Sequence, residues 1–271
     1  MTVRKGAPSG QRRCGIDVGT GELLVLCAFA FLAGGLDAIV GGGGLVQLPA
    51  LLVVLPQAPV VALLGTNKLA SVVGTASAAV TYNRRIAVDR RTAGWMAAAA
   101  FVGSAGGALL ATQVGSEVLE PVILVALVAV LLHTLRRPSL GEVELLRMRA
   151  RAQRATAVVG GAVIGFYDGF VGPGTGSFLV FLLVGAVGLS FLHASATAKV
   201  VNTATNLAAL ALFAYGGHVL WLLGAAMAAS NLAGSQIGTR LAIRRGSTWV
   251  RRVFLVVVGA LVLRLAYDVL T

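Results

Sequence analysis

The chain has 271 residues, of which 57% are hydrophobic and 12% are charged, and its mean hydropathy is +0.88. Soluble domains carry roughly 25% charged residues, so this composition excludes an ordinary water-soluble core. A net charge of +12 would indicate nucleic-acid binding in a soluble protein. Here the basic residues cluster between long apolar runs with few aromatics, which indicates membrane orientation and no nucleic-acid partner. The sequence therefore predicts an all-α polytopic membrane protein.

The N-terminal tail, residues 1–21, is polar, basic and glycine-rich, and we expect it to be disordered. Cys14 lies in this tail and Cys27 in the first apolar run. Their positions predict neither a disulfide framework nor a metal site. No cofactor is expected.

Apolar runs follow along the whole chain, and a helix needs about 20 residues to cross a bilayer. We expect about eight transmembrane helices plus two broken or re-entrant segments. The broken segments are 44–60, which contains Pro49, Pro56 and Pro59, and 174–192, which contains Gly185 and Gly188. The expected spans are 22–40, 62–82, 93–113, 120–135, 155–171, 194–215, 219–239 and 253–270.

The chain also repeats itself. Asp37 and Asp168 are 131 positions apart, and the same offset recurs without gaps over the whole repeat. It relates Gly41 to Gly172, Gly43 to Gly174, Thr66 to Thr197, Lys68 to Lys199, Gly103 to Gly234 and Gly107 to Gly238. This predicts a tandem duplication, with a first membrane repeat at 22–135 and a second at 155–271. Residues 136–154 form a charged linker, expected to be cytoplasmic.

Loop charge bears on the topology, because cytoplasmic loops are rich in Lys and Arg. Arginines cluster at 84–91, 136–154 and 240–252, whereas the connection 114–119 carries an acid and no base. Parallel halves with 44–60 re-entrant place the first two clusters and the N-terminus inside, but they place 240–252 outside. The alternative, inverted halves with five crossings each, places the linker outside. We expect the parallel version, and the alternative stays open.

Two glycine-rich segments follow intramembrane acids: "DAIVGGGGLVQLP" at 37–49 and "DGFVGPGTGSFLV" at 168–180. A dinucleotide loop would need a preceding strand and an acid about twenty residues on, and neither is present. Broken backbone inside a membrane is tolerated where protein or a water-filled cavity satisfies it. A helix restarting after such a break directs unpaired N–H groups forward, which suits an anion. The alternative is that these glycines only permit close helix packing, which is our interpretation of the small residues at 103–107 and 234–238.

Lys68 and Lys199 occupy matching places within apolar runs, and each begins a polar stripe at helical spacing. The stripes are Lys68, Ser71 and Thr75 in the first half and Lys199, Asn202 and Asn206 in the second. A lysine at the centre of a membrane helix costs roughly 2.5–3.5 kcal/mol, so both need compensation. We expect them to face a pathway and attract an anion. One alternative is that the lysines snorkel to the interface. The other is that they pair with Asp37 or Asp168, and an intramembrane aspartate of this kind could also relay protons.

The remaining candidates are weaker. Tyr167 and Tyr215 either line the cavity or lie in interfacial aromatic belts, and we expect the belts. No nucleophile–base set or metal-ligand spacing is present, so the sequence predicts a protein that is not an enzyme.

The segments 34–52, 65–82, 165–181, 196–213 and 234–252 together resemble the sulfite exporter TauE/SafE family of membrane permeases. The resemblance extends from Leu23 to the end of the chain. It implies a multi-pass transporter of the bacterial inner membrane that moves small, mostly sulfur-containing anions such as sulfite or organosulfonates. The substrate-binding positions that it carries over are Gly41, Gly43, Lys68, Gly172, Gly174, Thr175, Lys199, Asn202 and Asn206.

The sequence thus predicts a secondary transporter that binds a small anion between two glycine-broken segments, with Asp37 and Asp168 as proton-coupling candidates. An anion channel and a non-transporting membrane subunit of a larger assembly are the alternatives. The expected partners are the anionic substrate and the lipid bilayer, and homo-oligomerisation is left open.

Overall fold

The computed structural model describes residues 18–119, 121–123, 125 and 150–270. The regular elements within these ranges are helices: α1 (Thr20–Val40), α2 (Gly44–Val54), α3 (Val60–Asn83), α4 (Arg90–Gln113), α6 (Ala150–Phe170), α7 (Thr175–Leu182), a π-helical turn η1 (Leu183–Val187), α8 (Phe191–Tyr215) and α9 (Trp221–Leu270). Most of the expected tail, of the expected span 120–135 and of the linker 136–154 lies outside the described residues.

Three of the described helices, α1, α3 and α4, are both long and apolar enough to cross a membrane. The apolar helices α2 and α7 with η1 are shorter. With 11 residues, α2 is about 16 Å long, roughly half the thickness of the hydrocarbon core. Pro49 lies inside α2, and Gly188, with a φ of 92°, ends η1. The segments 44–60 and 174–192 are therefore interrupted, as the sequence predicts.

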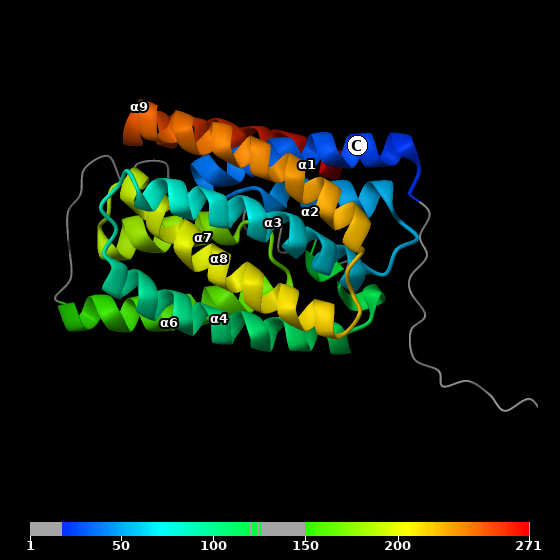
Figure 1. The fold of residues 1–271 in the computed structure, drawn as a ribbon, viewed down its shortest axis with the longest axis horizontal. Helices are drawn as coiled ribbons and strands as arrows, with labels where there is room; N and C mark the ends of the chain where they lie inside the picture. Colours follow the sequence, from blue (N-terminus) through cyan, green and yellow to red (C-terminus); the bar gives the residue numbers. More distant parts are fainter. Residues whose placement is uncertain (1–17, 120, 124, 126–149, 271) are drawn as a thin grey trace, which may run out of the picture.

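The helices form a layered bundle (Figure 1). The most extensive contacts join α4 to α6 and α1 to α9, and α3 and α8 lie between these two pairs. Thus α3 packs on α9 and α8, and α8 packs on α4. These two central helices carry Lys68 and Lys199, so the packing puts both lysines inside the bundle.

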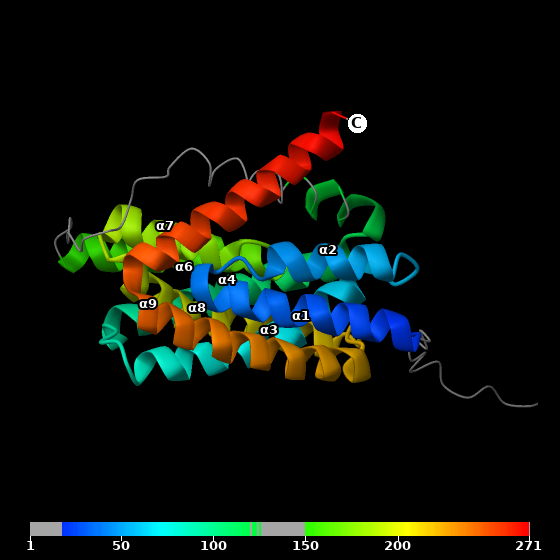
Figure 2. The same cartoon turned by 90° about the horizontal axis from the view of Figure 1, so that it is seen from above.

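The expected spans 219–239 and 253–270 belong to one long element, α9, which bends at Gly246. Gly246 has a φ of 75°, which interrupts the helical backbone. Beyond this residue the helix turns back and runs obliquely across the bundle, and its C-terminal end lies away from the other helices (Figure 2).

Small residues bring the helix backbones into close contact. A Cβ on Gly103 would meet the carbonyl of Ala162, and one on Gly234 would meet the carbonyl of Phe31. This confirms the interpretation of the segments 103–107 and 234–238 as packing surfaces.

Two serines add hydrogen bonds across these packed helices. Ser104 donates to the carbonyl of Thr205, and Ser235 donates to the carbonyl of Gly74, both over 2.7 Å. Ser104 and Ser235 are 131 positions apart, as are Gly74 and Thr205. The contacts between the two halves of the chain are therefore reciprocal.

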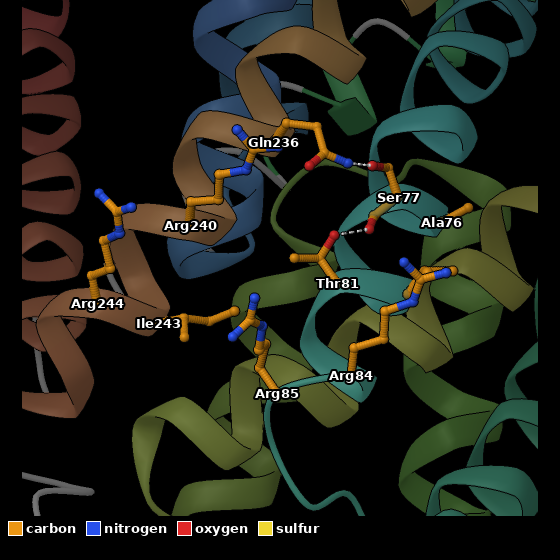
Figure 3. Close-up of a pocket in the computed structure, with 10 residues that line it drawn as sticks. Ala76, Ser77, Thr81, Arg84, Arg85, Gln236, Arg240, Ile243 and Arg244 are labelled. Atoms are coloured by element: carbon orange, nitrogen blue, oxygen red, sulfur yellow. Dashed lines mark hydrogen bonds between the residues drawn. The ribbon is translucent and has the colours of Figure 1, made fainter.

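The arginine clusters 84–91 and 240–252 lie at the same end of the bundle. Arg84, Arg85, Arg240 and Arg244 line one groove (Figure 3). The expectation that placed these two clusters on opposite sides of the membrane is therefore wrong. Its error was to treat 44–60 as re-entrant, because α2 runs back beside α1 and α3 begins at the end where α1 begins (Figure 1).

Three loops that connect helices lie together at the opposite end of the bundle. The backbone N–H of Val60 donates to Ser116 Oγ over 3.4 Å, and that of Leu220 donates to Thr66 Oγ1 over 3.0 Å. The connections before α3, after α4 and before α9 thus meet at one end. We call the end with the arginine groove the arginine end.

Candidate functional site

The first glycine break separates α1 from α2. Gly41 has a φ of 81°, which is the left-handed region, and its N–H caps α1 by donating to the carbonyl of Asp37 over 2.8 Å. The chain resumes as α2 at Gly44. At the start of α2 the N–H groups of Leu45 and Val46 already donate to the carbonyls of Gly42 and Gly43, each over 3.1 Å. The N–H of Gly44, which lines the central cavity described below, is therefore the backbone donor that α2 offers there.

The second break separates α6 from α7. Gly172 and Gly174 have φ values of 93° and 80°. Thr175 Oγ1 donates to the carbonyl of Gly172 over 2.8 Å, and the hydroxyl of Tyr167 donates to that of Pro173 over 2.6 Å. The expectation of an interfacial belt is therefore wrong for Tyr167, which braces the break. Tyr215, by contrast, is 93% exposed.

The two breaks touch each other. The N–H of Ser177 donates to the carbonyl of Gly41 over 3.2 Å. A Cβ on Gly41 would overlap the backbone of Gly176, and a Cβ on Gly176 would overlap that of Gly41. Only glycine on both sides permits this approach, so the two N-terminal helix ends meet at the centre of the bundle.

Both buried lysines pair with an aspartate of the other half. Lys68 Nζ lies 2.8 Å from Asp168 Oδ1, and Lys199 Nζ lies 2.8 Å from Asp37 Oδ2. The ion-pair alternative considered for these lysines is thereby confirmed, and neither lysine snorkels. Each pair joins the first half of the chain to the second, because the acid that precedes one break holds the lysine of the opposite half.

The two ion pairs differ in their surroundings. Lys68 and Asp168 are each 2% exposed, whereas Asp37 is 13% exposed. Within the part of the chain that the structure describes, Asp168 Oδ2 is buried and has no hydrogen-bond partner. Such an oxygen lacks the hydrogen bonds that buried polar atoms normally make, so it is available to a donor such as a water molecule.

A central cavity of about 20 Å³ lies between the breaks and the lysine pairs. A water molecule needs roughly 10–15 Å³ measured in this way, so there is room for about one water molecule and none for a larger ion. The lining residues are Asp37, Gly41, Gly44, Asn67, Lys68, Ser71, Asp168, Gly172, Gly174, Thr175, Gly176, Asn202 and Asn206.

Most of the residues proposed from sequence come together at this cavity. Seven of the nine substrate-binding candidates line it, and both proton-coupling candidates do so as well. The two exceptions are Gly43 and Lys199. A Cβ on Gly43 would overlap the Cβ of Asp37, so Gly43 lies behind that acid and makes room for it. Lys199 is fully buried and reaches the cavity only through Asp37.

An amide network beside the cavity was missed in the sequence. Gln47 Nε2 donates to Asn67 Oδ1 over 2.9 Å, and Gln47 Oε1 accepts from Asn231 Nδ2 over 2.8 Å. The network ties α2 to α3 and α9, and thereby fixes the start of α2. The available signal was an amide side chain within an otherwise apolar run, which applies to Gln47 in α2.

This architecture combines broken helices with buried, crosswise ion pairs, and comparison with known proteins gives its family. The sequence model of the sulfite exporter TauE/SafE family matches residues 26–265. The chain belongs to this family. The match covers nearly the whole chain, including both breaks and both lysines.

Curated relatives match the chain over most of their own length. A probable membrane transporter protein of Haemophilus influenzae is 35% identical over 257 residues, which cover 93% of this chain and 98% of the relative. The probable membrane transporter protein YfcA of Escherichia coli K12 is 36% identical over 244 residues, covering 90% and 89%. The probable membrane transporter protein ORF9 of a Sinorhizobium species is 37% identical over 247 residues, covering 91% and 93%. No solved structure matches the chain.

Membership in this family identifies the chain as a multi-pass membrane protein of a transporter family, not of an enzyme family. The resemblance found in the sequence is therefore confirmed.

Proposed function

We propose that this TauE/SafE protein is a secondary transporter for a small, sulfur-containing anion such as sulfite or an organosulfonate. The observation that carries the proposal is the pair of crosswise ion pairs, Lys68–Asp168 and Lys199–Asp37, at two glycine breaks that touch each other. Positive side chains and the N-terminal ends of two helices around one central cavity suit an oxyanion.

In the proposed bound state the anion replaces a carboxylate at a lysine. Lys68 lines the cavity directly. Gly44 and Gly176, in the first turns of α2 and α7, also line it, so both helices begin at the cavity. Asn202 and Asn206 supply amide donors from α8. Gly43 and Lys199 act indirectly, Gly43 by admitting Asp37 and Lys199 by holding it. Gly41, Gly172, Gly174 and Thr175 shape the two breaks.

Alternating access follows from the size of the cavity. Since about 20 Å³ holds only about one water molecule, an oxyanion enters only when the two breaks separate. Each ion pair joins one half of the chain to the other, so this separation loosens both pairs and releases the lysines. Substrate binding and opening of the site are thereby coupled.

Charge balance supports proton coupling. The two lysines and two aspartates sum to zero, so a bound anion leaves a net negative charge in a buried site. Uncompensated buried charge is costly, and protonation of one aspartate restores neutrality. We assign this role to Asp168, with its unpaired Oδ2, and keep Asp37 as the second candidate.

The proposed architecture is a pair of inverted repeats, 22–135 and 155–271, in the bacterial inner membrane. Reciprocal contacts at an offset of 131 residues support the two-fold relationship, as in the Ser104 and Ser235 hydrogen bonds. The shared groove of Arg84 and Arg240 supports the inverted orientation. The concentration of arginine at that end makes it the cytoplasmic one.

The test is uptake into proteoliposomes of sulfite, thiosulfate, sulfoacetate and taurine, with non-sulfur anions as controls. Lys68→Ala and Lys199→Ala should each abolish most uptake, whereas Arg90→Ala, at the exposed start of α4, should not. Unchanged uptake in a folded double lysine variant would rule out the anion site.

The same preparation separates a transporter from the rival channel. Preloading vesicles with unlabelled substrate should accelerate entry of labelled substrate, because a carrier exchanges one molecule for another. A channel shows no such acceleration. Absence of any transport would favour a non-transporting subunit.

A further inference from the structure

The groove at the arginine end is far larger than the central cavity. Its volume is about 830 Å³, and it lies between α3 and α9 (Figure 3). Gln236 of α9 donates a hydrogen bond to Ser77 of α3 across its floor. Val80 and Ile243 add apolar wall, so the groove combines polar and apolar surface.

Four arginines give the groove its charge. Arg84 and Arg85 follow the last turn of α3, Arg240 and Arg244 come from α9, and all four are exposed. No carboxylate is among the lining residues. Within the described ranges none of the four forms an ion pair, so their guanidinium groups are available to an external anion.

The groove does not lead to the central cavity. At about 100° per residue, Val80 and Arg84 lie on one face of α3, and Lys68 and Thr75 lie on a face roughly 150° away. Val80 is 51% exposed, whereas Lys68 and Thr75 are buried. The groove thus opens outward, on the side of α3 that faces away from the proposed substrate site.

The positions that the repeat relates to these four arginines carry no such charge. At the offset of 131 residues, Arg84 and Arg85 correspond to Tyr215 and Gly216, and Arg240 and Arg244 correspond to Leu109 and Gln113. The repeated helix packing therefore does not require arginine at these positions.

We propose that this groove binds the phosphate group of an acidic phospholipid. Guanidinium groups bind phosphate through paired hydrogen bonds, and basic pockets between membrane helices bind acidic head groups. The volume exceeds what a small anion fills, and the exposed Val80 beside Ile243 offers apolar surface to the acyl chains. The proposal is independent of the transported substrate.

The test uses the full-length protein in detergent and measures its melting temperature with added lipid. Phosphatidylglycerol should raise the melting temperature more than phosphatidylcholine, and less so at high salt because screening weakens the interaction. Arg84→Gln combined with Arg240→Gln should weaken the apparent affinity for phosphatidylglycerol roughly 25-fold, at about fivefold per arginine. The matched control, Arg90→Gln with Arg91→Gln, removes two exposed arginines that do not line the groove.

Three outcomes would overturn the proposal. The first is equal stabilisation by phosphatidylglycerol and phosphatidylcholine. The second is an equal loss in the groove variant and in the control, since this would show that net charge alone matters. The third is stabilisation by inorganic phosphate that phosphatidylglycerol does not exceed, because the groove would then be a site for soluble anions. Arg84→Lys with Arg240→Lys keeps the charge and should retain part of the lipid effect, which separates binding from misfolding.

Discussion

Lys68 of α3 and Asp168 of α6 form an ion pair in which both side chains are 2% exposed and Nζ lies 2.8 Å from Oδ1. Only one carboxylate oxygen is used, since Oδ2 has no partner among the described residues. A buried pair of this kind costs desolvation energy and is weak support for stability. Stability alone therefore does not account for this pair, and in the proposed function it serves anion binding.

Removal of one partner of this pair should be worse than removal of both. Lys68→Met leaves Asp168 as an unpaired buried charge and should destabilise the protein by about 3–5 kcal/mol. Lys68→Met with Asp168→Leu should recover most of that loss while transport stays absent. Thermal unfolding in detergent, with uptake assays in parallel, measures both. Strict additivity of the two single effects would contradict the ion pair.

Neutralising Asp168, the proposed proton carrier, should abolish substrate accumulation driven by a pH gradient but leave substrate exchange across the membrane intact. Asp168→Asn keeps the size of the side chain and an oxygen that accepts from Lys68, but it no longer binds a proton. We expect substrate exchange between the two sides to continue and accumulation driven by a pH gradient to be lost. Asp37→Asn is the matched variant. If gradient-driven accumulation persists in Asp168→Asn and fails in Asp37→Asn, the proton site is Asp37.

The contact between the glycine breaks should tolerate no side chain. Gly41→Ala places a Cβ against the backbone of Gly176 and in a left-handed conformation, so we expect a loss of at least about 3 kcal/mol. Gly94→Ala is the control, because this glycine lies within α4 with no neighbour near its Cβ. It should stabilise the protein by up to about 1 kcal/mol. Expression level and melting temperature report both effects, and a normally stable Gly41→Ala protein would disprove the contact.

The orientation of the halves is accessible to labelling. Single cysteines in a cysteine-free background replace Ala87 and Ser247 near the arginine end, and Ser116 and Gly217 at the opposite end. An impermeant thiol reagent should label the first two from one side of the membrane and the last two from the other. Labelling of Ala87→Cys and Ser247→Cys from different sides would instead support parallel halves.

The start of α4 supplies a pH-dependent contribution outside the spans. Asp89 accepts hydrogen bonds from Thr92 and from the N–H of Arg91, and these bonds lower the pKa of its carboxyl. Since the pKa is lower in the folded state, this stabilisation is present above the unfolded pKa of about 3.9 and disappears as the pH falls through the folded value. Asp89→Ala should cost about 1 kcal/mol at pH 7. The difference in melting temperature from the wild type should shrink on acidification below about pH 4, and a growing difference would contradict this assignment.

Much of the site was predictable because it depends on residue types that are costly in a membrane. Lys68, Lys199, Asp37 and Asp168 stand out by charge alone, and the offset of 131 residues relates the two sets. Which acid meets which lysine was not predictable, since helix spacing within one half carries no information about the other. Each lysine pairs with the aspartate of the opposite half because α3 and α8 pack side by side at the centre of the bundle.

The topology failed for a different reason. The count of crossings depended on α2, which is too short for a span by length alone and yet returns the chain to the end where α1 begins. Hydropathy and length show whether a helix can span the bilayer, but they do not show at which end of the bundle the helix finishes. Gln47 and Asn231 were missed because a lone amide in an apolar run gives no sign of its partner.

The one-sided arginine groove also bears on how such a protein arises. Reciprocal contacts of the kind seen for Lys68 and Lys199 are those of a symmetric dimer, in which two identical half-length subunits would build the same site from opposite orientations. Identical subunits, however, would carry the same arginines at both faces and would have no preferred direction in the membrane. A single chain allows Arg84 and Arg240 to differ from Tyr215 and Leu109. In the proposed inverted arrangement, joining the halves thus lets a symmetric site form in a molecule whose two membrane faces differ.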